Sequence, residues 1–368
     1  MKPKQIIVLS IILGILAFGL LLKSWVRSVA DNARTGLGER TTFAEFDPVK
    51  LERIQIGRGS QSPVIELLNE NGVWKVKSLW NAQADPVKVE NLIQKLHSAQ
   101  GELRGSGKKL FEDFGIQDTN ALSVKFFGAG DTLLQDLRLG TKQAGENAYF
   151  IRKGTSEDVY LVEVNMAELF GIDTALNEAT LTSLFWTDLS LFNLDPEKVT
   201  KITLYLLKGD GKTMITGLER QADPKDPLKS SWKFLRKDIS SSLDPDKILK
   251  FIVMMSSLRA EKIVDPGGKG YGLERPFWQL AVTENGKKTL LNAGSKDEKA
   301  GFFYVKHPED ATIFGLNVSF FDDLNVDDTH FLKDIPPAAE PKKDPPQDVT
   351  DDAPVLQSSL LEGQEQAA

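Results

Sequence analysis

The amino-acid sequence predicts an α+β protein with an N-terminal transmembrane helix followed by two duplicated domains, each an antiparallel sheet with a helix packed on one face. Two observations lead to this prediction. A run of apolar and small residues with a single Ser covers Ile6–Leu22. Farther along, three unlike features occur twice in the same order: a Trp beside alternating apolar residues, an Asp-Pro pair before an amphipathic stretch, and an aromatic-Gly-aliphatic triplet.

The spacing of these features indicates an internal duplication. The matching positions are Trp74 and Trp232 (158 apart), Asp85 and Asp244 (159), and Phe114 and Tyr271 (157). Asp47 and Asp195 are 148 apart, so an insertion separates these landmarks in the second copy, and Arg220–Ser231 is the candidate. Solenoid repeats have periods of roughly 20 to 50 residues, so the longer period here indicates duplicated domains instead.

The repeats and the composition together divide the chain into six parts. After about Lys333 the sequence is rich in Pro and acidic residues, a composition that favours disorder. Val355–Leu361 is its apolar stretch, where a docking peptide and an inert tail are both open. We predict an N-terminal transmembrane anchor at 1–23, a juxtamembrane linker at 24–46, the first α+β repeat at 47–163, a connecting segment at 164–194, the second α+β repeat at 195–333, and a disordered Pro-rich acidic tail at 334–368.

The composition argues against several classes of function. The chain has 368 residues, a formal charge of −7, three His and no Cys. An acidic balance is unusual for a nucleic-acid-binding protein, which normally presents a basic face. The absence of Cys removes disulfides, thiolate zinc sites and Cys nucleophiles. We therefore expect no nucleic-acid partner and no cofactor or metal.

The apolar run is long enough to anchor the chain in a membrane. A helix of about 17 residues covers about 25 Å, which suffices for a bilayer core when flanking lysines extend toward the headgroups. A cleavable signal peptide is the alternative, because Ser28-Val29-Ala30 has the small-x-small pattern of a cleavage site. Lys23, Trp25 and Arg27 separate that site from the apolar run and favour an uncleaved anchor.

The charges beside this segment leave its orientation open. Two basic residues precede it and four follow it, namely Lys23, Arg27, Arg34 and Arg40. The positive-inside rule alone would place the body in the cytoplasm, but the rule weakens for long translocated domains.

Each repeat has the signals of hairpins. In the first repeat, two apolar-alternating runs, Val64–Leu68 and Val73–Val76, flank Asn71-Gly72, the strongest short hairpin signal. A later hairpin is expected on either side of residues 128–131, and its counterpart in the second repeat turns at Asn285-Gly286. These patterns predict antiparallel strands.

One amphipathic helix is expected in each repeat, after Asp85-Pro86 and after Asp244-Pro245. An N-cap Asp accepts a hydrogen bond from a free backbone N–H, and Pro at the next position sacrifices no bond. Paired carboxylates at equivalent places could also suggest catalysis. The Pro beside each one favours structural caps or turns for Asp47, Asp85, Asp195 and Asp244.

Other candidate sites are weak. Residues 128–130 and 265–270 are Gly-rich but lack the pattern of a phosphate-binding loop, and they are expected to be turns. His97, His307 and His330 show no metal-ligand spacing. Trp74, Trp232 and Trp278 lie in predicted strands, where aromatic residues are common core residues. These three could instead line a groove between the repeats.

The repeated pattern resembles a bacterial family known as the domain of unknown function 4340 family. The resemblance rests on the lead-in Leu184–Ile202, the strand Trp, the Ala84-Asp85-Pro86 helix start and the triplets that begin at Phe114 and Tyr271. It covers roughly residues 1–332. It implies an N-terminal membrane segment, one or two copies of this unit, and association with gliding-motility-type ABC transporter auxiliary proteins. Residues 186–188 depart from the basic form of the lead-in, and the resemblance supplies no catalytic residues.

We expect a non-catalytic, membrane-anchored accessory or scaffold protein of an ABC-type export or envelope system. It would span the bacterial inner membrane once through Ile6–Leu22, with its body in the periplasm and with other membrane or transporter subunits as partners. The alternative is an extracytoplasmic binding module for a polymer or peptide held in the groove between the repeats. An enzyme would need a cluster of acid, base and nucleophile that the sequence does not suggest.

Overall fold

The computed structural model describes residues 40–59, 65–145, 147–172, 180–222, 230–236 and 242–334. The chain divides into one unit that ends at Leu332 and a second unit, Lys333–Ala368. Every strand and helix below belongs to the first unit. Among the described residues, no helix has the length and apolar composition needed to cross a bilayer. The segment Ile6–Leu22, the linker up to residue 39 and the predicted tail from residue 335 lie outside the described residues.

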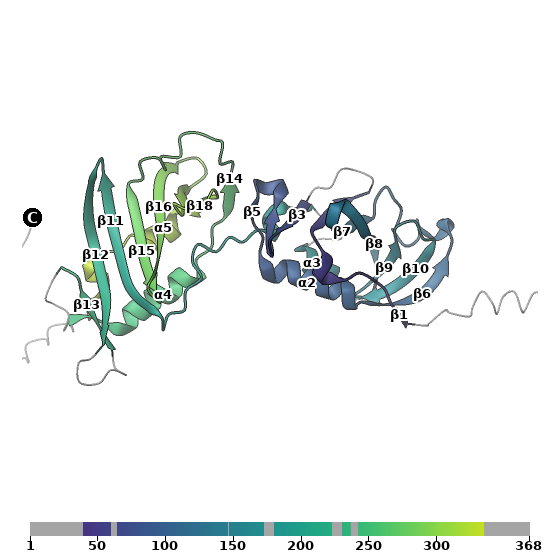
Figure 1. The fold of residues 1–368 in the computed structure, drawn as a ribbon, viewed down its shortest axis with the longest axis horizontal. Coiled ribbons are helices and arrows are strands. Elements are labelled where there is room, and N and C mark those ends of the chain that lie inside the picture. The colour runs from purple at the N-terminus through teal and green to yellow at the C-terminus, as the bar shows by residue number, and fades with distance from the viewer. Residues whose placement is uncertain are drawn as a thin grey trace, which may run out of the picture. The chain divides into compact units, whose positions relative to one another are not determined.

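Ten strands in the described part of the chain form a first antiparallel sheet (Figure 1). Their order across the sheet is β1-β6-β10-β9-β8-β7-β2-β3-β4-β5. The strands are β1 Arg40–Thr42, β2 Arg53–Arg58, β3 Ile65–Glu70, β4 Val73–Val76, β5 Ala82–Gln83, β6 Gln100–Ser106, β7 Leu122–Gly128, β8 Thr132–Gly145, β9 Ala148–Lys153 and β10 Asp158–Glu163.

A second antiparallel sheet contains eight strands within the described ranges. Their order is β13-β12-β11-β15-β16-β17-β18-β14. The strands are β11 Val199–Lys208, β12 Gly211–Ala222, β13 Ser230–Phe234, β14 Lys262–Val264, β15 Trp278–Glu284, β16 Lys287–Asp297, β17 Phe302–Lys306 and β18 Ile313–Asn317.

The two sheets have the same strand order. From β4 to β6 the first sheet runs β4-β3-β2-β7-β8-β9-β10-β6, which matches the second sheet strand for strand, and β1 and β5 are added at its two edges. This is the arrangement that a duplication predicts. We call residues 40–187 the first module and residues 188–333 the second module.

Few helices accompany the sheets, so the fold is mainly antiparallel β, with less helix than the α+β prediction implied. The two long helices start at the predicted Asp-Pro pairs. The helices are α2 Pro86–Ser98, α3 Met166–Phe170, α4 Pro245–Ser257 and α5 Val318–Leu324, and the 3₁₀ turns are η1 Pro48–Lys50, η2 Lys77–Leu79, η3 Lys108–Leu110, η4 Ala129–Asp131, η5 Ser183–Trp186 and η7 Asp328–Phe331.

Each long helix covers one face of its own sheet, and the core lies between them (Figure 1). Successive strand residues point to opposite faces, so the alternating apolar residues of the central strands all face the helix. In the first module α2 buries Val89, Leu92, Ile93 and Leu96 against Ile54, Ile56, Val124 and Phe126. In the second module α4 buries Ile248, Phe251, Ile252 and Met255 against Ile202, Leu204, Leu280 and Val282.

The Asn-Gly hairpins form as predicted. Asn71 and Gly72 join β3 to β4 with φ of 56° and 87°, and Asn285 and Gly286 join β15 to β16 with φ of 48° and 76°. Two successive positive φ angles twist the chain in the sense that flanking strands require, and Asn and Gly tolerate them best.

In both modules the backbone of the aromatic-Gly-aliphatic triplet passes over a strand at a glycine of that strand. Gly115 and Gly272 have φ of 66° and 69°. A Cβ placed on Gly140 of β8 would lie 2.6 Å from the Phe114 carbonyl oxygen, and one on Gly294 of β16 would lie 2.1 Å from the Tyr271 carbonyl oxygen. The triplet passes so close to the strand that only Gly fits, which explains why this motif occurs twice.

A leading segment brings the chain into each module along the same path. In the first module Phe43 N donates to Ala99 O at 2.9 Å, after β1 has paired with β6. In the second module Leu191 N donates to Leu258 O at 3.0 Å. Both bonds attach the leading segment to the residue that follows the long helix.

A closing segment ends each module in the same way. Asp85 N donates to Trp186 O, and Asp244 N donates to Phe331 O, both at 2.8 Å. Trp186 and Phe331 are completely buried. The next residues, Thr187 and Leu332, form single bridges to the residues preceding Asp85 and Asp244.

The closing segment of the first module continues directly as the leading segment of the second. Thr187 still pairs with Ala84 of the first module. Asp188 N donates to Gln83 O at 2.9 Å, and Leu189 O accepts from Ala260 N of the second module at 2.8 Å. Residues 187–191 of the predicted connecting segment are therefore bonded to both modules.

The outer face of the first sheet holds a network of charged groups. The buried Arg152 donates to Ile116 O at 3.0 Å and to the Asp118 carboxylate, and it lies over the Phe111 ring at 4.4 Å. Arg138 also contacts Asp118 at 3.4 Å. Partial burial raises the pKa of Asp118, but the hydrogen bonds and charges of the two arginines outweigh it and hold that pKa below its usual value.

Replacing Gly294 with Ala is expected to destabilise the protein by about 1–3 kcal/mol, because the added Cβ meets backbone atoms rather than a flexible side chain. Urea unfolding followed by circular dichroism measures this. Gly267→Ala is the matched control, since its Cβ would meet nothing nearer than 3.3 Å, at the Asp265 side chain. An equal loss of stability in both variants would contradict the close approach of the triplet backbone to Gly294.

Asp118→Asn is expected to lower stability at neutral pH and to matter less in acid. A carboxylate whose folded pKa is depressed stabilises the fold above its unfolded pKa, about 3.9, and this contribution is lost as the pH falls through the folded value. The difference in unfolding midpoint between wild type and variant is therefore expected to shrink below about pH 4. A difference that does not depend on pH would show that the charge of Asp118 is unimportant.

Candidate binding pocket

The helix α4 supplies one wall of a pocket in the second module. Asp244 begins the helix by accepting bonds from Asp246 N at 2.9 Å and Lys247 N at 3.4 Å. The apolar face of α4 packs against the sheet. Lys247, Lys250 and Met254 lie off that face and line the pocket.

The opposite wall is the chain from α5 to η7. Phe321 and Leu324 of α5 are buried, as is Phe331 of η7, so both ends of this stretch are attached to the core. Between them Asn325 Oδ1 accepts from the buried Trp278 Nε1 at 3.1 Å. These contacts fix the backbone that carries Asp322, Asp323 and Asp327.

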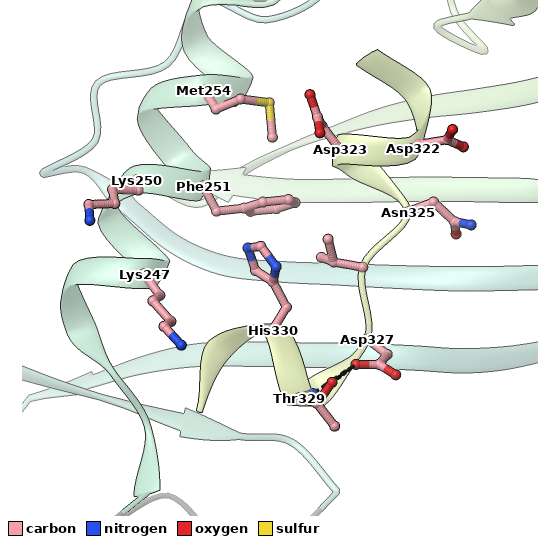
Figure 2. Close-up of a pocket in the computed structure, with 11 residues that line it drawn as sticks. Lys247, Lys250, Phe251, Met254, Asp322, Asp323, Asn325, Asp327, Thr329 and His330 are labelled. Atoms are coloured by element: carbon pink, nitrogen blue, oxygen red, sulfur yellow. Dashed lines mark hydrogen bonds between the residues drawn. The ribbon is translucent and has the colours of Figure 1, made fainter. Parts of the chain in front are cut away.

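The pocket between these walls has a volume of about 790 Å³ and is open to solvent. Figure 2 shows Lys247 and Lys250 on the α4 side and Asp322 and Asp327 on the opposite side. Its lining consists of Lys247, Lys250, Phe251, Met254, Asp322, Asp323, Asn325, Val326, Asp327, Thr329 and His330.

Some of the polar groups in the pocket hold the fold together. Lys247 Nζ donates to Leu332 O at 2.8 Å, which ties α4 to the closing segment. Asp327 Oδ1 accepts from Thr329 N at 2.8 Å and caps η7. The His330 ring packs edge-to-face on Phe331 at 5.0 Å and on Phe251 at 6.0 Å.

The chemistry that this arrangement offers is binding through charges of both signs around an apolar floor. In the described part of the chain, no group of three or more His, Cys, Asp or Glu could hold a metal ion. His97, His307 and His330 lie apart: the His97 ring packs at a tilt on Phe46, with centroids 5.3 Å apart, and His307 Nδ1 bonds with Leu290 O at 2.7 Å.

The pattern of the chain is that of a known sequence family. The model of the family described as Domain of unknown function (DUF4340) matches residues 74–276, more than half of the chain. The chain belongs to the DUF4340 family. The match begins in β4 of the first module and ends just before β15 of the second, so it includes both long helices.

Two further comparisons give no neighbour for this DUF4340 protein. No curated protein matches it significantly. No solved structure matches it significantly either. The family description names no activity, so the site has to be judged from its geometry.

All four aspartates singled out in this DUF4340 chain accept backbone bonds at the start of a helix or turn. Asp47 accepts from Val49 N at 3.1 Å and Asp195 from Glu197 N at 3.1 Å, as Asp85 and Asp244 do at the long helices. Hydrogen bonding by Lys198 is the main cause of a lowered pKa at Asp195. The four are spread over both modules and do not converge on one place.

Sequence reasoning missed the lysine that follows each of these aspartates. At these four aspartates the sequence reads Asp-Pro-x-Lys (47–50, 85–88, 195–198 and 244–247), a pattern that also occurs at 226–229, and it was the available signal. Lys88 Nζ donates to Phe185 O at 2.6 Å, just as Lys247 donates to Leu332 O. Burial lowers the pKa of Lys88, and the nearby Asp85 carboxylate opposes that shift.

The three tryptophans predicted to line a groove lie in or against the two cores. Trp278 is completely buried in the second core, where it packs on Phe321. Trp74 packs against the first core and Trp232 against the second. A Trp in a strand has the same sequence signal whichever face it takes, so the sequence alone does not distinguish these positions from groove positions.

Asp244→Ala is expected to cost about 1 kcal/mol of stability, because two N–H groups at the start of α4 lose their acceptor. Asp244→Asn is the matched control: its amide oxygen can still accept those bonds, and Asn is as good an N-cap as Asp. Chemical unfolding of both variants measures this. If Asn were as damaging as Ala, the charge of Asp244 would have a role beyond capping.

Proposed function

We propose that the protein is a non-catalytic, membrane-anchored scaffold that holds partner proteins at the cell envelope. The observation that carries this proposal is the repeated module. Two sheets with the same strand order are joined so that the closing segment of one is the leading segment of the next. Duplication of an ancestral domain accounts for this most simply, and a series of modules suits a protein that spans a distance or presents several surfaces.

The recurrent polar residues support a structural role. The aspartates and lysines of the Asp-Pro-x-Lys pattern bind backbone groups or each other, as in the 2.7 Å contact of Lys198 with Asp195. The glycines of the repeated triplets permit close backbone crossings. What the two modules share is thus accounted for by folding.

The proposed location follows from the sequence. The apolar segment Ile6–Leu22 would span the inner membrane once, and the two modules would lie in the periplasm. The resemblance to proteins associated with gliding-motility-type ABC transporter auxiliary proteins supports an ABC-type export or envelope assembly as the partner. In this proposal the anchor keeps the scaffold beside a membrane-embedded complex.

Binding of a ligand or peptide is the second candidate function, and the pocket favours it. The pocket lies within the second module, between α4 and the α5–η7 stretch. A binding role there is compatible with the scaffold, since a scaffold needs a contact surface. The sequence alone placed such a groove between the repeats instead.

Protease treatment of intact spheroplasts tests the proposed location. If the body is periplasmic, added protease is expected to remove a C-terminal tag from the membrane-bound chain, and a variant without residues 1–23 is expected to leave the membrane fraction. A tag that is cut only after lysis would contradict a periplasmic body.

Affinity purification from membranes tests the proposed partner. The full chain is expected to recover a transporter or envelope subunit, and the shortened variant, as the control, is expected to recover none.

A further inference from the structure

The pocket contains charges that the fold does not use. Within the described residues, the side chains of Lys250, Asp322 and Asp323 make neither a salt bridge nor a hydrogen bond, and all three residues are exposed. They differ in this from Lys247, Asp327 and Asn325, which hold the walls together. The unused charges therefore remain available to a ligand.

The two aspartates also lie at an unfavourable helix end. Asp322 and Asp323 are in the last turn of the short helix α5, near the negative end of its dipole. This wall of the pocket thus adds negative side-chain charge to a negative helix end, which costs stability unless something outside the helix compensates.

The result is a pocket with two oppositely charged walls and an apolar floor. Phe251 and Met254 extend from α4 between the lysines and the aspartates and form the apolar floor (Figure 2). Val326 also lines the pocket. Its volume of about 790 Å³ is within the usual range for ligand pockets. A ligand that complements it carries a negative group, an apolar group and a positive group, in that order across the pocket.

The first module has an apolar ring at the position that corresponds to His330 of the pocket. Its closing segment has Phe185 where the second module has His330, as the matching bonds of Trp186 and Phe331 show. The Phe185 ring lies 4.3 Å from Lys88 Nζ. Cavities described near α2 and α3 are only about 230 and 240 Å³. In the second module the smaller and polar His330 stands at that place and lines the larger pocket.

We propose that this pocket binds a peptide segment of a partner protein in which a basic and an acidic side chain flank an aromatic one. The basic side chain contacts Asp322 and Asp323, the acidic one contacts Lys250, and the ring lies on Phe251 and Met254. The inference rests on the proposed scaffold function, because it names the surface through which the scaffold holds a partner.

Fluorescence anisotropy of labelled pentapeptides on the full-length chain tests the proposal. The probe Gly-Lys-Phe-Glu-Gly is expected to bind about tenfold more tightly than Gly-Gln-Phe-Gln-Gly, because two charge pairs are added. The difference is expected to fade at 1 M salt, where the screening length falls to about 3 Å. Equal affinity of the two peptides, or no binding of either, would overturn the proposal.

The double variant Asp322→Asn with Asp323→Asn separates binding from folding. It is expected to reduce the preference for the charged peptide from about tenfold to about threefold, because one of the two charge pairs is lost and the pair with Lys250 remains. It is also expected to raise the midpoint of thermal unfolding, because it removes two anions from a helix C-terminus. Glu309→Gln, an exposed acid of the same module outside the pocket, is the matched control and is expected to change neither. A preserved preference, or a lowered midpoint, would contradict the inference.

The peptide assay and the membrane purification together distinguish failure of this inference from failure of the scaffold proposal. If the protein binds the charged and the neutral peptide equally while the intact chain still recovers an envelope subunit from membranes, the pocket is not the contact surface and the scaffold proposal stands. If no subunit is recovered but the peptide preference holds, the pocket binds peptides and the scaffold proposal fails.

Discussion

Each module closes around one backbone hydrogen bond, between the N–H of the aspartate that begins the long helix and the carbonyl of a buried aromatic residue far along the chain. The bond is 2.8 Å long in both modules, from Asp85 to Trp186 and from Asp244 to Phe331. It pins the start of the helix to the end of the module, and a lysine one turn later adds a second tie. The pocket depends on this constraint, because the same bond holds η7 opposite α4.

Local signals made part of this fold predictable. Asn-Gly turns and Asp-Pro helix starts act through the backbone of a few adjacent residues, so they can be read without knowing the tertiary structure. The closing bond joins residues 101 positions apart in the first module and 87 apart in the second, and no local sequence pattern indicates it. The burial of Trp278 and the pocket charges depend likewise on which faces meet after folding. The edge strands β1 and β14 are three residues each, too short to show a period.

The two modules are alike in backbone and unlike in surface. Where the first sheet has Arg138 hydrogen-bonded to Ser123 at 2.8 Å, the second has the neutral pair Gln279 and Asn292, also at 2.8 Å. Likewise Phe185 in one closing segment corresponds to His330 in the other. Folding requires the shared features, whereas the differing surfaces are free to serve separate contacts. One strand order thus presents two chemically different surfaces in the same chain.

The segment shared by the two modules has a mechanical consequence. Thr187 pairs with Ala84, Asp188 bonds to Gln83, and Leu189 and Leu191 bond to Ala260 and Leu258 within the next three residues. Under tension applied between the start of the first module and the end of the second, this stretch cannot lengthen without breaking backbone bonds on both sides. The two modules would then resist a pulling force as one body, with no slack linker between them to extend first.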